Sequence, residues 1–160
     1  MVASRLYVCN SQSGSISVID TSRNTVTTSF RTGSRPISLS LIGKELYILN
    51  NSDNNLTVIH TDTNTPILTP TLEATIPVGS DPQLIIKVGT KLYIINKGDH
   101  TVSVVDTTLK KVIKVIPVGK SPVSGLILGN KLHIINNLDN SLSVIDTTKD
   151  EVINTLLTGK

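Results

Sequence analysis

Few side chains in this sequence could bind a metal ion or catalyse a reaction, and they are scattered along it. The three histidines lie at the end of a strand-like run, in a turn and within another run: His60, His100 and His133. Because zinc and copper sites need converging ligands, this spacing predicts no metal site. The one cysteine, Cys9, lies in an apolar run and is typical of a small buried hydrophobic residue. We therefore expect no catalytic residue, no metal and no cofactor.

Charged side chains in turns are better candidates for contacts with a partner. Three similar turns, which we call the proline links, cover 33–36, 79–82 and 119–122. They carry charged residues at equivalent positions, namely Arg35, Asp81 and Lys120. We expect these residues to form a mixed-charge rim that makes polar contacts with a partner. The alternative is that they are solvated turn tips.

A second set of turns, which we call the asparagine links, covers 50–55, 96–100 and 136–140. Each contains one aspartate: Asp53, Asp99 and Asp139. Recurrent carboxylates can bind calcium, but such a site needs about six or more converging oxygens. Because Asn and Asp side chains also cap their own turns, each aspartate is most simply a turn residue.

All these turns are positioned by a unit of about forty residues that occurs four times. The copies open at Leu6, Leu46, Leu92 and Leu132, at offsets of 40, 46 and 40 residues. Their boundaries are about 6–45, 46–91, 92–131 and 132–160, and we expect them to form a single domain over 1–160. A fixed period of this size is typical of a solenoid or a propeller. No window shows the period of an α-helix, so a helical solenoid is excluded.

Each copy contains short apolar runs bounded by turn residues, which is the pattern of consecutive antiparallel hairpins. The first runs are 6–10, 46–50, 92–96 and 132–136, and the second are 15–20, 55–60, 101–106 and 141–146. The third are 25–31, 72–78, 112–118 and 152–158, and the fourth are 36–42, 82–88 and 122–128. Apolar residues occur on both alternations of several runs, so both faces of each sheet are covered. We therefore predict an all-β propeller of four-stranded antiparallel blades.

Proline and glycine indicate where these runs lie in a blade. Pro77 and Pro117 interrupt third runs, and since proline cannot donate to a ladder, the third run is predicted to be the outer edge strand. Glycine follows the third run at 33, 79, 119 and 159, and the fourth run at 43, 89 and 129. At both places we expect glycine to supply a positive φ for a tight reversal.

The composition argues against two classes of function. The net charge is only +3, the basic residues are scattered, and aromatic residues make up 2% of the chain. A nucleic-acid-binding protein shows a basic stripe or stacking aromatic side chains instead. No segment approaches the roughly 18 consecutive apolar residues that span a membrane. We expect neither nucleic-acid binding nor a membrane span.

The third copy, in its segments Leu92–Thr107 and Val115–Pro122, resembles the YVTN repeat of β-propellers. The tetrad that names this family stands here as Tyr7–Asn10, Tyr47–Asn50, Tyr93–Asn96 and His133–Asn136. The resemblance covers essentially the whole chain. It implies a binding module of cell surfaces or of secreted and periplasmic proteins, a family in which most members have no assigned reaction. We therefore expect an extracellular or cell-surface protein.

The second copy departs from the others by six extra residues within 61–72, which include Pro66 and Pro70. Insertions in repeat proteins map to loops and often to binding faces. The two prolines favour a stiff, extended segment, so this loop is a second candidate for binding a partner. A neutral expansion of the loop is the alternative.

We take the fourth run as the inner strand of a blade. It occurs three times and the other runs four times, so the first blade is expected to lack its inner strand. Three arrangements fit this count: a small closed ring, an open arc that pairs with a second copy to make a larger ring, or an excerpt of a larger propeller. Apolar residues at both ends, such as Val26, Leu156 and Leu157, favour closure or pairing over a free arc.

These patterns lead to one expectation of function and to two alternatives. We expect a non-catalytic scaffold or binding module that presents loops to a protein or glycan partner, or that self-associates through its open blade ends, as in a homodimer. One alternative is a propeller enzyme of the lyase or lactonase type with its site at the mouth of the central channel. The other is a fragment of a larger propeller. Convergent His, Asp or Glu side chains at the channel mouth would distinguish the enzyme.

Overall fold

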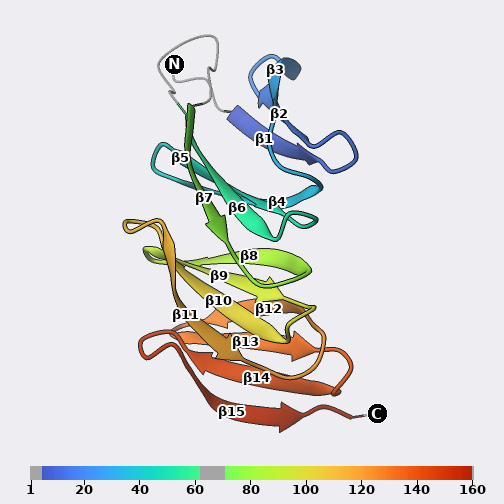
Figure 1. Ribbon diagram of the computed structural model, residues 1–160, viewed down its shortest axis with the longest axis vertical. Coiled ribbons are helices and arrows are strands. Elements are labelled where there is room, and N and C mark those ends of the chain that lie inside the picture. The colour runs from blue at the N-terminus through green and yellow to red at the C-terminus, as the bar shows by residue number, and fades with distance from the viewer. Residues whose placement is uncertain (1–4, 62–70, 160) are drawn as a thin grey trace. The chain divides into compact units, whose positions relative to one another are not determined.

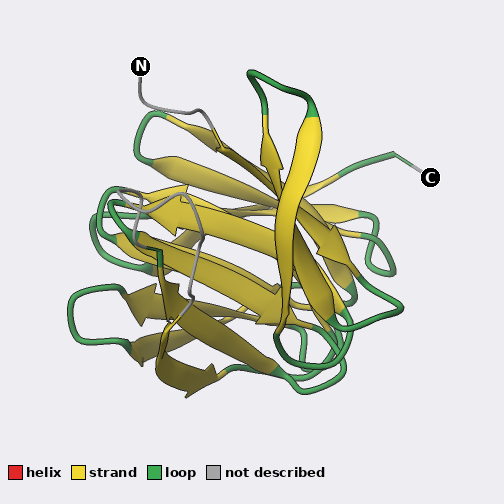
Figure 2. Ribbon diagram, turned by 90° about the horizontal axis from the view of Figure 1, so that it is seen from above, coloured by secondary structure: helices red, strands yellow, loops and turns green. Residues whose placement is uncertain are grey.

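The computed structural model describes residues 5–61 and 71–159, and every regular element in them is a β-strand (Figures 1 and 2). The strands form separate antiparallel sheets in chain order, which we call blades 1 to 4. Blade 1 contains β1 (Arg5–Asn10), β2 (Ser15–Asp20) and β3 (Thr25–Arg31). Blade 2 contains β4 (Pro36–Ile42), β5 (Glu45–Asn50), β6 (Asn55–His60) and β7 (Thr71–Pro77). Blade 3 contains β8 (Pro82–Val88), β9 (Lys91–Asn96), β10 (Thr101–Asp106) and β11 (Lys111–Pro117). Blade 4 contains β12 (Pro122–Leu128), β13 (Lys131–Asn136), β14 (Ser141–Asp146) and β15 (Glu151–Leu157).

The predicted runs coincide with these strands to within a residue at either end, which confirms the all-β prediction for the described residues. Neighbouring strands pair in sequence order in every blade, as expected for hairpins joined by short turns. Blade 1 has three strands among the described residues, also as predicted. No helix in the described part of the chain is long and apolar enough to cross a membrane.

The third runs form edge strands, as the two prolines predict. β7 and β11 are the last strands of their sheets, and Pro77 and Pro117 are the final residues of those strands. No strand lies beyond an edge strand. The missing N–H of a proline there therefore costs the sheet no hydrogen bond.

The chain comprises two compact units, Met1–Thr75 and Ile76–Lys160. Within each unit, consecutive blades pack face to face. We call the face of a blade that packs on the next blade its trailing face, and the opposite face its leading face. Alternate residues along each strand belong to one face or the other, as the pleat requires.

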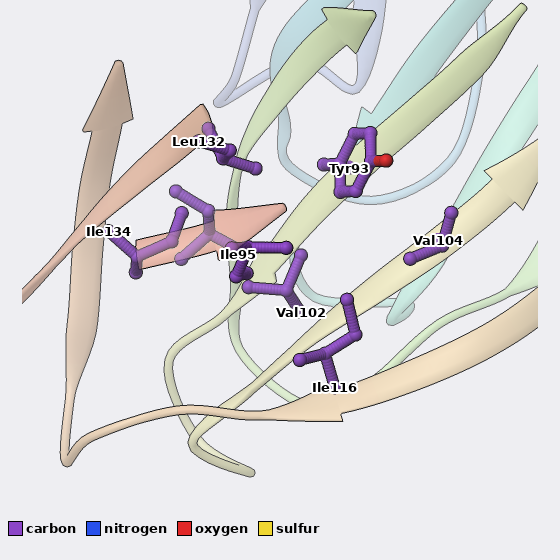
Figure 3. Close-up of a cluster of buried hydrophobic side chains, with 8 residues drawn as sticks. Tyr93, Ile95, Val102, Val104, Ile116, Leu132 and Ile134 are labelled. Carbon is purple, nitrogen blue, oxygen red and sulfur yellow. The ribbon is translucent and has the colours of Figure 1, made fainter. Parts of the chain in front are cut away.

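In the second unit, the trailing face of blade 3 packs against the leading face of blade 4. The fully buried residues on the blade 3 side include Tyr93, Ile95 and Val102, and they meet Leu132 and Ile134 of blade 4 (Figure 3). Each buried aliphatic side chain of this kind stabilises the fold by about 1.5–3 kcal/mol. The second unit is therefore held together largely by this aliphatic contact.

The first unit repeats the same packing with different residues. Tyr7, Ile16 and Val18 of the trailing face of blade 1 form a buried cluster with Leu46 and Ile48 of the leading face of blade 2. Cys9 packs against this cluster, as predicted for a small hydrophobic residue, and burial raises the pKa of its thiol. A raised pKa keeps the thiol protonated and unreactive.

The positive φ that we predict for the glycines is found after the fourth run but not after the third. After the fourth run, Gly43, Gly89 and Gly129 have φ of 59°, 59° and 60°, as expected for a tight reversal. After the third run the prediction is wrong, because Gly79, for example, does not have a positive φ. A Cβ atom there would lie 2.6 Å from Cγ of Asn96, so the glycine is needed for close approach.

Candidate functional site: a polar cavity at the proline link of the first unit

The proline links and the asparagine links lie side by side at one end of the blades, and their backbones are hydrogen-bonded together. In the first unit the N–H of Asn51 donates to the carbonyl of Arg35 (3.0 Å), and that of Ser52 donates to Ser34 (3.3 Å). In the second unit Lys97 donates in the same way to Asp81 (3.1 Å). The two kinds of link therefore form one surface in each unit, which we call the link face.

The recurrent aspartates lie in turns, as predicted, but each carboxylate binds the neighbouring proline link and so fastens one link to the other. Oδ2 of each aspartate accepts a backbone N–H from the proline link. The pairs are Ser34 to Asp53 (2.7 Å), Ser80 to Asp99 (2.7 Å) and Lys120 to Asp139 (2.6 Å). In the second unit the Ser80 hydroxyl also donates to Asp99 at 2.6 Å, and these bonds lower the pKa of Asp99.

A buried asparagine supports each link from below. In the first unit Nδ2 of Asn50, a fully buried residue, donates to Oδ1 of Asn55 (2.8 Å) and to Oγ1 of Thr57 (2.7 Å). Asn96 and Asn136 make the same pair of bonds to hydroxyl groups of their own blades. Because Nδ2 of each amide donates two hydrogen bonds, the side chain beneath the proline link is fixed in position.

The equivalence that we predict for the three rim residues is wrong by one position. Arg35 and Asp81 precede a proline and have φ of 55° and 46°, and the residue with this place and conformation in blade 4 is Ser121, with φ of 53°. Lys120 lies one residue earlier and corresponds to Ser80, whose N–H also binds an aspartate. Lys120 is misplaced because the prediction aligns the three links by their charged residues and not by the distance of each residue from the proline.

The first unit contains a cavity of about 330 Å³ at the link face. It is lined by polar side chains of blade 1, of the first proline link and of the first asparagine link, including Gln12, Ser13, Arg31, Ser34, Arg35 and Asp53. Arg31 and Arg35 are both exposed. Nη1 of Arg35 donates to Oδ1 of Asn51 at 2.9 Å, which orients the guanidinium while leaving further N–H groups for a ligand.

A second cavity of about 340 Å³ continues from Arg31 along the leading face of blade 2, past Asn55 to Leu72. The second unit has an equivalent groove of about 270 Å³ beside Thr101. Pro77 stands there in the place of Arg31. The groove of the second unit therefore lacks the guanidinium that the first unit presents.

The structure assigns the predicted rim residues to different units. Arg35 belongs to the first unit, where it lines the cavity. Asp81 and Lys120 belong to the second, where Asp81 Oδ2 lies 3.8 Å from Nζ of Lys97. The other candidate loop, with Pro66 and Pro70, lies outside the described residues.

Gln12 and Arg31 are not among the residues that the sequence predicts for this site. A signal for Arg31 is present, because the corresponding residues of the other copies are Pro77, Pro117 and Leu157. An arginine at a position that is otherwise apolar marks a departure from the repeat. Gln12 has no comparable signal.

The three histidines lie in unrelated surroundings. Nδ1 of His60 is 3.1 Å from Oε1 of Glu73, and Nδ1 of His100 accepts the backbone N–H of Ser121 at 3.1 Å. His133 takes the place of a repeat tyrosine, and its Nδ1 is buried without a hydrogen-bond partner. Within 5–61 and 71–159, no three His, Cys, Asp or Glu side chains are grouped so that they could hold a metal ion.

Solved structures that resemble the chain include two propeller-like proteins. Hydrazine synthase of Kuenenia stuttgartiensis matches with a TM-score of 0.84 and 21% identity, over 96% of this chain and 46% of that chain. BamB of Moraxella catarrhalis matches with a TM-score of 0.69 and 16% identity, over 97% and 46%. A functionally unknown protein of Desulfotomaculum acetoxidans matches with a TM-score of 0.73 and 17% identity, over 97% and 56%.

The chain thus spans about half the length of the structures that it matches. No protein-family model matches the sequence, and no curated protein does. Because one of the similar structures is a synthase by name and another has no known function, the fold by itself does not decide the function. These likenesses show that the chain has a propeller-like, all-β fold.

Proposed function

We propose that this protein is a non-catalytic binding module of the YVTN type, which uses the link face of its first unit to hold an acidic segment of a protein partner. The observation that carries the proposal is the cavity that Arg31 and Arg35 line together. Guanidinium groups bind carboxylates with two parallel hydrogen bonds, which gives both affinity and orientation. The proposal includes the extracellular or cell-surface location that the repeat implies.

The rest of the cavity lining supports a peptide more than a sugar. The Gln12 amide and the Ser13 and Ser34 hydroxyl groups can bind a peptide backbone, while Asp53 is already engaged by the N–H of Ser34. Sugar rings commonly stack on aromatic side chains, and none of the residues that line this cavity is aromatic. A glycan that carries carboxylates is therefore the weaker candidate, although the same arginines would contact it.

Self-association through the blade ends is a second candidate function. Its specific support is the exposure of large apolar side chains at both ends of the blade series, such as Leu6 in blade 1 and Leu126 in blade 4. Such surfaces mark interaction sites in soluble proteins. This candidate is independent of ligand binding at the link face.

Titration calorimetry with an acetylated, amidated hexaglutamate peptide tests the binding proposal. Arg35→Ser introduces the residue that blade 4 has at this position, so the turn keeps its conformation. Lys44→Thr, at the opposite end of the blade, introduces the residue that blade 3 has there and is the matched control. We expect R35S to weaken binding about tenfold, the effect of one lost charge-assisted hydrogen bond, and K44T to leave it unchanged.

Binding of the peptide should also weaken as salt is added, because exposed charges are screened. Equal affinity of R35S and wild type, or no heat of binding at millimolar peptide, would overturn the proposal. A parallel titration with trigalacturonate distinguishes the partner class: tighter binding of the sugar than of the peptide would assign the site to a glycan.

A further inference from the structure

The trailing face of blade 4 is apolar and exposed. Leu126, Leu128, Ile135 and Leu156 lie on this face with 61%, 60%, 48% and 45% of their surfaces exposed. The repeat-equivalent residues of blade 3, such as Ile86 and Ile95, pack against the leading face of blade 4. Blade 4 therefore has the surface that receives a following blade in this fold.

The leading face of blade 1 is the reciprocal surface. Leu6, Val8 and Val26 lie there and are 51%, 37% and 63% exposed. The residues equivalent to Leu6 and Val8 in blade 4 are Leu132 and Ile134, which are fully buried against blade 3. Blade 1 therefore has the surface that a preceding blade covers.

The polar groups at the margin of these faces also correspond. Between blades 3 and 4, Nζ of Lys91 lies 2.5 Å from Oδ2 of Asp150, and the Tyr93 hydroxyl donates to Oδ1 of the same carboxylate. In blade 4 the residues equivalent to Lys91 and Tyr93 are Lys131 and His133, and Nδ1 of His133 is buried without a hydrogen-bond partner.

Blade 1 supplies a counterpart for Lys131. Asn24 occupies the turn position of Asp150 and has nearly the same φ, 53° against 55°. An asparagine side chain carries both a donor and an acceptor. It could thus accept from Lys131 Nζ, as the carboxylate of Asp150 accepts from Lys91 Nζ.

We propose that the trailing face of blade 4 binds the leading face of blade 1 of a second copy of this chain, in the geometry that joins blades 3 and 4. Leu126 and Ile135 of one copy then cover Leu6 and Val8 of the other, and Lys131 meets Asn24. Because the two surfaces differ, the contact is head to tail, and in the proposed closed pair each chain uses both of its surfaces.

Light scattering during size exclusion tests the pairing. Wild type should have twice the 17.2 kDa mass of one chain. Leu126→Glu and Leu6→Glu should each prevent the closed ring, whereas Leu138→Glu, at an equally exposed leucine in an asparagine link, should leave it intact. A wild-type mass of one chain at 100 µM, or a series of masses above two chains, would overturn the proposal.

Mixing the two variants tests the head-to-tail direction. L126E retains an intact leading face and L6E an intact trailing face, so their mixture should form a pair through the one remaining contact. Neither variant should form a closed pair alone. If L6E alone still forms a tight dimer, the contact joins two trailing faces instead, and the proposed geometry is wrong.

Cross-linking checks the register of the contact. Nζ of Lys114 and Oε1 of Glu151 lie 3.2 Å apart between blades 3 and 4, and the equivalent residues across the proposed contact are Asn154 and Thr25. With Cys9→Ile as background, N154C/T25C treated with a short bismaleimide should give covalent pairs. K114C/E151C should react within one chain. Reaction of the control without covalent pairs from N154C/T25C would overturn the register.

Discussion

The hydroxyl group of Tyr93 in β9 donates a hydrogen bond to Oδ1 of Asp150, in the turn between β14 and β15. Nζ of Lys91 lies 2.5 Å from the other oxygen of this carboxylate. Tyr93 is fully buried, and its burial, followed by its hydrogen bond to Asp150, raises the pKa of the hydroxyl above its ordinary value. One carboxylate therefore fastens two side chains of blade 3 to blade 4.

We predict that Asp150→Asn lowers the free energy of unfolding by roughly 1–3 kcal/mol, because Lys91 loses its counter-charge and Tyr93 a strong acceptor. Urea denaturation followed by circular dichroism measures the change. Glu151→Gln breaks the neighbouring Lys114–Glu151 pair, in which the two side chains are 40% and 62% exposed, and serves as control. The control should cost at most about 0.5 kcal/mol. A D150N variant as stable as E151Q would contradict this interpretation of the carboxylate.

A methyl group at Gly79 should destabilise the second unit. Its Cβ would lie 2.6 Å from Cγ and Nδ2 of Asn96, a residue that is buried and held by two hydrogen bonds. Because Asn96 cannot move without losing those bonds, we expect Gly79→Ala to cost about 1–3 kcal/mol, the usual range for overpacking. Thermal unfolding compares it with Gly159→Ala, where a Cβ meets nothing within 4 Å. Equal melting temperatures for the two variants would refute the close-packing role.

The pH dependence of the link face follows from Asp99. The hydroxyl and the N–H of Ser80 lower the pKa of its carboxyl group below the ordinary value, which is about 3.9. A lowered pKa in the folded state adds stability above the unfolded-state pKa, and this stability is lost as the pH falls through the folded-state value. Removing the hydroxyl with Ser80→Ala should therefore raise the pKa of Asp99 towards 3.9. The variant should then lose less stability as the pH falls.

Carboxyl carbon NMR titration measures this shift directly and includes its own control. The pKa of Asp146 is lowered by Thr148, in a separate turn, and should not change in S80A. If the pKa of Asp99 is the same in S80A, or if the pKa of Asp146 changes equally, the Ser80 hydroxyl is not what lowers the pKa of Asp99.

The fold was predictable because each blade repeats the same short-range signals. Apolar runs mark the strands, and Pro77 and Pro117 mark edge strands. These features depend on residues close in sequence, so a single chain reveals them. Repetition also multiplies the evidence for each one.

The features that the sequence does not predict depend on contacts between residues distant in sequence. Nothing near Gly79 reveals that the amide of Asn96 packs against it, and nothing near Lys91 reveals Asp150, which lies 59 residues away. The cavity likewise forms because Arg31 ends one strand and Arg35 follows in the next link, on either side of Gly33. Spatial proximity of this kind is set by blade packing and not by the local pattern.

The most direct test of the binding account maps where the acidic peptide binds. Nitrogen-15 NMR spectra of the protein should be recorded during titration with hexaglutamate, in wild type and in R35S. We predict that the backbone amide shifts cluster at residues 12–14, 31–35 and 51–53 in wild type and shrink in R35S. Shifts that cluster instead at the opposite end of blade 2, around Lys44, or that are the same in R35S, would contradict the account.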